Sequence, residues 1–166
     1  MGEAAAGAEE EALALIAGFL LRIGIPLSAD TLHGEQFLPG IAIRDGGLVY
    51  DPVKLQWPGD LLHEAGHIAV TDPALRPGLC EPSDDPGEEM AAIAWSWAAA
   101  MEIGLAPAIL FHEGGYRGAS AAFIDNFSNG RDVGVPMLAA WDMTTEIHRA
   151  RKFGGIPYPT MRRWLR

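Results

Sequence analysis

The segment that most restricts the fold is the pentapeptide HEAGH at residues 63–67. In a helix, side chains four residues apart lie on one face, so His63 and His67 would present both imidazole rings to the same point. Their neighbours are small or apolar, which is typical of a helix buried in a protein core. Asp60 is placed to cap this helix or to favour its N-terminal end, and the Asp-Pro dipeptide beyond it ends the helix. The chain is therefore expected to fold around a buried helix that carries ionisable groups.

Two histidines at this spacing, with a glutamate next to the first, are typical of zinc sites on helices. His63 and His67 would ligate the ion, and Glu64 would project toward a water molecule beside it. A catalytic zinc normally has three protein ligands, so a third ligand is needed. The extended pattern HExxHxxGxxH is excluded, because positions 70 and 73 are Val70 and Pro73. The third ligand must come from another part of the chain.

Three acidic residues are candidates for this third ligand. Asp72 could serve only if the chain turned back at once, and it fits better as a residue that ends the helix. Glu88 and Glu89 begin the next, almost wholly apolar helix, where an inward-facing carboxylate needs a positive partner. With Asp85 as N-cap and Pro86 as the first helical residue, Glu88 takes the third position, where a capping box would use it. We therefore favour Glu89, with Glu88 and Asp72 as alternatives.

The pattern along the chain predicts an α+β fold that is mainly helical. Two short β runs, at 41–44 and 48–50, are joined by Asp-Gly-Gly and predict a β-hairpin. This hairpin is expected to pack on the HEAGH helix and on the glutamate helix that follows it. Four prolines and two glycines predict a loop over 73–87.

The remaining segments are expected to be helical and to belong to a single domain, 1–166, with a metal-binding core at about 41–107 and a helical C-terminal part at 108–166. Apolar spacing and breaking residues predict helices from Glu10 to just before Gly24, over the enclosed stretch 90–106, and at 120–127, 136–141 and, as a short basic helix, 160–166.

Composition and charge exclude several classes of protein. Of the 166 residues, 49% are hydrophobic and 20% are charged, which suits a core that needs no disulfide or structural metal. The formal net charge of -10 would repel phosphate backbones, so nucleic acid is not expected as the main ligand. Cys80 is the only cysteine, which excludes a disulfide within the chain.

The longest apolar run, at 12–21, is about half as long as a helix that crosses a bilayer. Three glutamates precede this run, where a secretory signal would carry basic residues. We therefore expect a cytoplasmic protein with no membrane segment.

An HExxH motif followed by a glutamate on the next helix resembles the gluzincin group of zinc peptidases. The layout of hairpin, HEAGH helix and glutamate helix is similar to that of the small bacterial metallopeptidases that cleave phage-type repressors. The stretch that begins at Glu89, EMAA, is similar to their ExxA sequence. The chain departs from the group at Ile93, where many members place Asp or Asn to orient a histidine.

The resemblance implies a hydrolase in which Zn²⁺ is held by His63, His67 and Glu89 and Glu64 is the general base. It implies a peptide or protein substrate, whose extended backbone would pair with the hairpin strand at 48–50.

Such enzymes also need a donor for the oxyanion, and His112, Tyr116 and His148 are the candidates. The alternative function is a non-catalytic zinc-binding regulator or adaptor, against which retention of Glu64 argues mildly. The sequence does not specify the oligomeric state.

Overall fold

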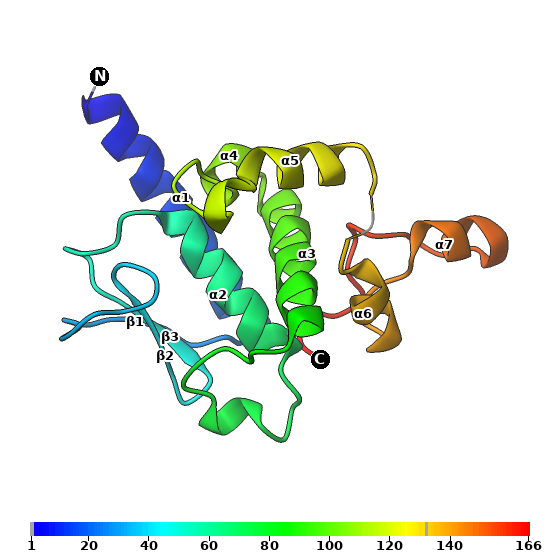
Figure 1. Ribbon diagram of the computed structural model, residues 1–166, viewed down its shortest axis with the longest axis horizontal. Helices are drawn as coiled ribbons and strands as arrows, with labels where there is room; N and C mark the ends of the chain where they lie inside the picture. Colours follow the sequence, from blue (N-terminus) through cyan, green and yellow to red (C-terminus); the bar gives the residue numbers. More distant parts are fainter. Residues whose placement is uncertain (1, 132) are drawn as a thin grey trace.

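Helix α2 (Pro58–Val70) lies at the centre of the fold, and every one of its residues is buried. The computed structural model describes residues 2–131 and 133–166. Helix α3 (Pro86–Ile103) packs along α2, and α1 (Gly2–Ile23) lies behind this pair (Figure 1). The apolar residues of the three helices meet in one core, which includes Ile16, Phe19, Leu20, Leu61, Leu62, Ile68 and Trp95.

A three-stranded sheet packs against α2, on the side away from α3, so among the described residues the expected packing of the hairpin on the α3 helix is not found (Figure 1). It consists of β1 (Leu27–Ala29), β2 (Ile41–Arg44) and β3 (Gly47–Tyr50), in the order β1-β3-β2. Strands β2 and β3 form the predicted hairpin, in which Asp45 and Gly46 take positive φ angles of 48° and 73°. Left-handed backbone at both central positions is what a tight hairpin turn requires, which explains the Asp-Gly sequence.

The central place of β3 corrects one expectation from the sequence. Strand β3 pairs with β1 on one side, in parallel, and with β2 on the other, antiparallel. Both of its edges are therefore filled, so the prediction that this strand pairs with a substrate backbone is wrong. The short parallel strand β1 was not predicted, and it is this strand that fills the second edge.

The part of the chain after α3 consists of short helices. These are α4 (Pro107–Leu110), α5 (Ser120–Ser128), α6 (Val135–Ala140) and α7 (Ile147–Phe153). Helices α4 and α5 cross the end of the α2–α3 pair, and α6 packs on α3 (Figure 1). The predicted mainly helical α+β fold is thus confirmed.

Two of the helices predicted from the sequence differ from the structure, one in its start and one in its existence. Helix α1 begins at Gly2 rather than at Glu10. The expected basic helix at 160–166 is absent, because long-range contacts hold this described segment in an irregular path. Met161 forms an isolated β-bridge with Thr144, and the Trp164 carbonyl accepts a hydrogen bond of 2.9 Å from the Trp95 indole. The helix of the tail is instead α7.

Within the described residues, none of the helices has the length and apolar character needed to cross a membrane.

Candidate metal centre

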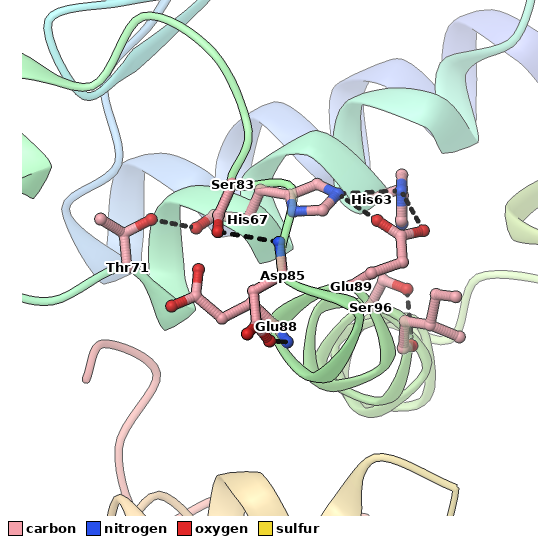
Figure 2. Close-up of polar contacts among 9 residues, drawn as sticks. His63, His67, Thr71, Ser83, Asp85, Glu88, Glu89 and Ser96 are labelled. Atoms are coloured by element: carbon pink, nitrogen blue, oxygen red, sulfur yellow. Dashed lines mark hydrogen bonds and ion pairs between the residues drawn. The ribbon is translucent and has the colours of Figure 1, made fainter.

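The two histidines of α2 point their Nε2 atoms at a common position. These atoms lie 3.2 Å apart, and both residues are buried (Figure 2). One ligand atom from each of His63, Glu64 and His67 lies within 4.8 Å of the other two, so this buried group could hold a metal ion. The spacing of four residues on one helix produces this convergence, as the sequence predicts.

A carboxylate from α3 faces the same position. The Oε2 atom of Glu89 lies 3.0 Å from Nε2 of His67, and its Oε1 atom lies 3.6 Å from Nε2 of His63 (Figure 2). Asp85 is the N-cap of α3 and accepts the backbone N–H of Glu88 at 2.9 Å. This capping sets the register of the first turn, in which Glu89 is the residue that faces α2.

The other two candidates for a third ligand lie elsewhere. In the described part of the chain, the ion pairs of His63 and His67 are made with Glu89 and not with Glu88 or Asp72. Asp72 instead accepts the backbone N–H of Ala74 at 2.8 Å, in the turn that follows α2.

The distances fit a divalent ion with nitrogen and oxygen ligands. Two histidine nitrogens bound tetrahedrally to zinc at about 2.0–2.1 Å lie roughly 3.3 Å apart. The observed separation of 3.2 Å between the two Nε2 atoms is close to that value. The carboxylate of Glu89 supplies an oxygen on the same side of both rings, so the set provides three donors of the kinds that zinc prefers.

The burial of His63 keeps its imidazole in the form that binds metals. Desolvation lowers the pKa of His63 to about 4, with the neighbouring His67 adding to the effect. The ring is therefore neutral at pH 7, as a metal ligand must be. Glu89 is half-exposed, and its hydrogen bond with His67 lowers the pKa of its carboxyl, so it is ionised.

The His63 ring is oriented by contacts with other rings and not, within the described chain, by a hydrogen bond at its second nitrogen. Its Nδ1 atom is buried and has no hydrogen-bond partner among the described residues. The ring instead meets the Tyr116 ring edge-on at 5.4 Å and the His67 ring edge-on at 4.8 Å. Ile93, at the position where the resemblance leads us to expect an acidic or amide residue, lines the same cavity.

Glu64 lies beside the two histidines and is almost fully buried, with 6% of its surface exposed. Desolvation raises the pKa of this carboxyl from 4.5 to about 7, and the charges of Glu89 and Asp60 act in the same direction. A carboxyl with this pKa can both accept and return a proton near neutral pH.

The site opens into a cavity of about 940 Å³. Its walls come from four parts of the chain: the segment before β2, the start of α2, the start of α3 with the loop before it, and the segment between α4 and α5. Apolar side chains line much of it, among them Leu38, Trp57, Met90, Ile93 and Phe123. A polar site in an apolar cavity of this size is typical of small-molecule or peptide binding.

Two of the three candidates for the oxyanion donor line this cavity. Tyr116 has a buried hydroxyl with no hydrogen-bond partner among the described residues, and burial raises the pKa of its phenol. His112 lines the cavity too, but its Nε2 atom is already bonded to Asp60. His148 lies on α7 with 71% of its side chain exposed and pairs with Glu146, so it is not part of the site.

The Asp60–His112 pair is the feature of the site that the sequence did not indicate. Asp60 is not the N-cap of α2, because Trp57 occupies that position and Pro58 begins the helix. The Asp60 side chain turns inward and accepts a hydrogen bond of 2.8 Å from His112, and both residues are buried. An acidic residue three positions before the first histidine of HExxH was the signal, but its partner lies 52 residues away.

Comparison with known proteins identifies no relative of this chain. No protein-family model, curated protein or solved structure matches the chain at a significant level.

Proposed function

We propose that this protein is a zinc-dependent metallopeptidase of the gluzincin type, which hydrolyses bonds in a peptide or protein substrate. The observation that carries the proposal is the convergence of three donor groups with a buried carboxyl beside them. The two Nε2 atoms lie 3.2 Å apart, Glu89 lies within 3.0–3.6 Å of both, and Glu64 has a pKa of about 7. A metal site without catalytic activity has no need of this last group.

His63, His67 and Glu89 would hold the ion. Bound Zn²⁺ supplies Lewis acidity, which polarises a peptide carbonyl and makes water a stronger acid. Glu64 would take a proton from the attacking water at its carboxylate and give it to the nitrogen of the leaving amine. Burial of Glu64 supports both steps, because it brings the pKa of the carboxyl close to neutral pH.

Tyr116 is the residue best placed to stabilise the oxyanion. Its hydroxyl is buried and has no hydrogen-bond partner among the described residues, and the residue lines the same cavity as Glu64. The raised pKa keeps the phenol protonated, so it can donate a hydrogen bond to the negative oxygen that develops during attack.

The metal is tested by elemental analysis of the purified protein and three variants. We expect about one zinc per chain in the wild type, none in His67→Ala, and weakened binding in Glu89→Ala. Glu88→Ala is the matched control, because it removes the neighbouring carboxylate of the same helix turn and should retain zinc. Zinc loss from Glu88→Ala instead of Glu89→Ala would assign the third ligand to Glu88.

The activity is tested by incubating the zinc-loaded protein with a library of peptides. We expect cleavage by the wild type and a loss of about 10²-fold or more in Glu64→Gln, with zinc still bound. A protein that binds zinc at all three ligands but whose Glu64→Gln variant cleaves as well as the wild type would contradict the proposed mechanism. Zinc binding with no cleavage of peptides or of candidate protein substrates would favour the regulator or adaptor.

A further inference from the structure

The segment between α4 and α5, residues 112–118, holds Tyr116 in an unfavourable backbone conformation. Tyr116 and Arg117 have φ angles of 55° and 52°, in the left-handed region that residues with a side chain rarely adopt. The Tyr116 hydroxyl is moreover buried without a hydrogen-bond partner among the described residues. Both features cost free energy, so other contacts must hold this segment against α2.

The contact that joins the segment to α2 is the pair formed by His112 and Asp60. His112 begins the segment, and Asp60 lies in the first turn of α2, one turn before His63. The imidazole donates from Nε2 to the Asp60 carboxylate at 2.8 Å, with about 5% of each residue exposed. A hydrogen bond to a charged group is stronger than one between neutral groups, and burial removes the competition from water.

The rest of the segment is built around the His112 ring. Trp57 stacks on one face, with ring centres 4.3 Å apart and planes 9° from parallel. Gly115 lies so close to the ring that an added Cβ atom would be 2.9 Å from its Cε1 atom. The His112 carbonyl accepts hydrogen bonds from the Gly115 N–H at 3.1 Å and from the Ser120 hydroxyl at 2.6 Å. The ring is thus packed between Trp57 and Gly115, the residue that immediately precedes Tyr116.

We propose that Asp60 and His112 form a positioning pair, whose hydrogen bond ties residues 112–118 to the first turn of α2 and so holds Tyr116 in the wall of the cavity, with its ring 5.4 Å from that of His63. The pair acts through Tyr116 and does not itself contact the substrate. Its part in the reaction rests on the proposed peptidase function, whereas its hold on the segment does not. An experiment can therefore refute the role of the pair in the reaction without refuting its hold on residues 112–118, and the reverse.

The hold on the segment is tested by limited trypsin digestion, since Arg117 is exposed and is followed by Gly118. Mass spectrometry gives the initial rate of cleavage after Arg117, relative to cleavage after the exposed Lys152 on α7. We expect His112→Ala to raise this ratio about tenfold or more, because cleavage follows the population of the opened segment. His112→Gln, which keeps an N–H donor for Asp60, should restore most of the protection.

A control separates this effect from a general loss of stability. Tyr158→Phe removes a buried hydrogen bond of 2.9 Å to the Ala94 carbonyl, remote in sequence from the segment. This variant should lower the melting temperature without raising the cleavage ratio at Arg117. An unchanged ratio in both His112→Ala and Asp60→Ala, or the same increase in Tyr158→Phe, would overturn the proposal. If His112→Ala does not fold, the Asp60→Asn variant supplies the comparison, with a smaller increase expected.

The role in the reaction is tested by a double-mutant cycle on peptide hydrolysis. If His112 acts through Tyr116, His112→Ala and Tyr116→Phe each lower kcat, His112→Gln retains most of it, and His112→Ala causes no further loss once Tyr116 is Phe. Losses that multiply in the double variant would overturn the positioning role. A wild type that binds no zinc and cleaves nothing would refute the proposed function, while the trypsin result would still decide the contact between Asp60 and His112.

Discussion

The smallest feature on which the site depends is the absence of a side chain at Gly66, between the two halves of the metal motif. A Cβ atom added there would lie 2.7 Å from the Ala92 carbonyl oxygen on α3, closer than any normal contact. Helices α2 and α3 therefore approach each other at a glycine, and this approach brings the Glu89 carboxylate to the histidines. The G of HEAGH thus has a packing role, although the motif itself leaves that position free.

We expect Gly66→Ala to lower the free energy of unfolding by about 1–3 kcal/mol, because the helices must move apart to admit the methyl group. The same movement separates Glu89 from the histidines, so zinc affinity should fall as well. Gly18→Ala is the matched control, since Gly18 is an exposed helical glycine with no atom within 4 Å of the added Cβ. It should stabilise the protein by about 1 kcal/mol. Urea unfolding and zinc titration measure both effects.

Asp51, at the end of β3, makes the stability of the protein depend on pH. Its buried carboxylate accepts the backbone N–H groups of Leu32 at 3.0 Å and Val53 at 2.9 Å, which lowers the pKa of the carboxyl below 3.8. A lowered pKa means that the ionised form stabilises the folded state. This contribution is fully present above the unfolded pKa and is lost as the pH falls through the folded value.

Asp51→Asn should therefore destabilise the protein at pH 6, where the wild type is ionised, and the difference should shrink as the pH falls below about 3.8. Urea unfolding at several pH values measures the difference. Asp30→Asn, an exposed carboxylate paired with Arg44, serves as control and should change stability less at pH 6. A difference that grows toward acid pH would contradict this assignment.

At the scale of elements, the sequence predicted those helices and strands whose ends are determined by neighbouring residues in the chain. The hairpin turn, the N-cap of α3 and the breakers that bound α2 each lie within a few residues of the elements they define. Strand β1 has three residues and exists through pairing with β3, some 20 residues later. The tail at 160–166 is likewise shaped by distant partners, since the Trp164 ring packs on Phe19 and Trp95. Such contacts leave no periodic pattern in the sequence.

Arg76 adds to the capping of the C-terminal end of α2, where Thr71 is the C-cap residue and bonds the His67 carbonyl. Its guanidinium donates to the carbonyls of Ile68 and Thr71 at 3.1 Å, and to that of Arg166 at 2.8 Å. The carbonyls of Ile68 and Thr71 lie at the end of α2, where helical partners run out, so Arg76→Ala should destabilise the protein by about 1–3 kcal/mol. Arg131→Ala removes an exposed arginine that pairs with Asp125 and should cost less than about 0.5 kcal/mol. Equal losses in the two variants would argue against the capping role.

At the scale of the whole molecule, the sequence predicted the convergence of His63, His67 and Glu89 but not the frame that surrounds them. Their spacing within one helix, and the capping of the next, predicted which side chains converge at the α2–α3 pair. The cavity walls are assembled from four separate parts of the chain, and the pairing of Asp60 with His112 spans 52 residues. Contacts of that range depend on how α4 and α5 pack over α2, which no local pattern specifies.

Because the donor groups come from two helices, a bound ion would join α2 to α3 and stabilise the fold. At a free zinc concentration 100 times the Kd, the gain is about 2.7 kcal/mol, which corresponds to about 5–10 °C in Tm for a chain of this size. The chelated protein should remain folded, since its core is large enough without a metal. Thermal unfolding with zinc and with chelator measures the shift, which Glu89→Ala should largely abolish. A chelated protein without a cooperative transition would show that the metal is structural.

The close approach of α2 and α3 at Gly66 sets the distance between the two histidines and Glu89. The relative affinity of the site for metal ions of different size should therefore depend on this distance. Ions of different radius require different separations between the nitrogens of α2 and the carboxylate of α3. The ratio of the affinities for zinc and for the larger cadmium ion therefore reports on that separation. A substitution that spreads the helices by a fraction of an ångström would shift the preference toward cadmium. Selectivity between two metals can thus report on the packing of the core.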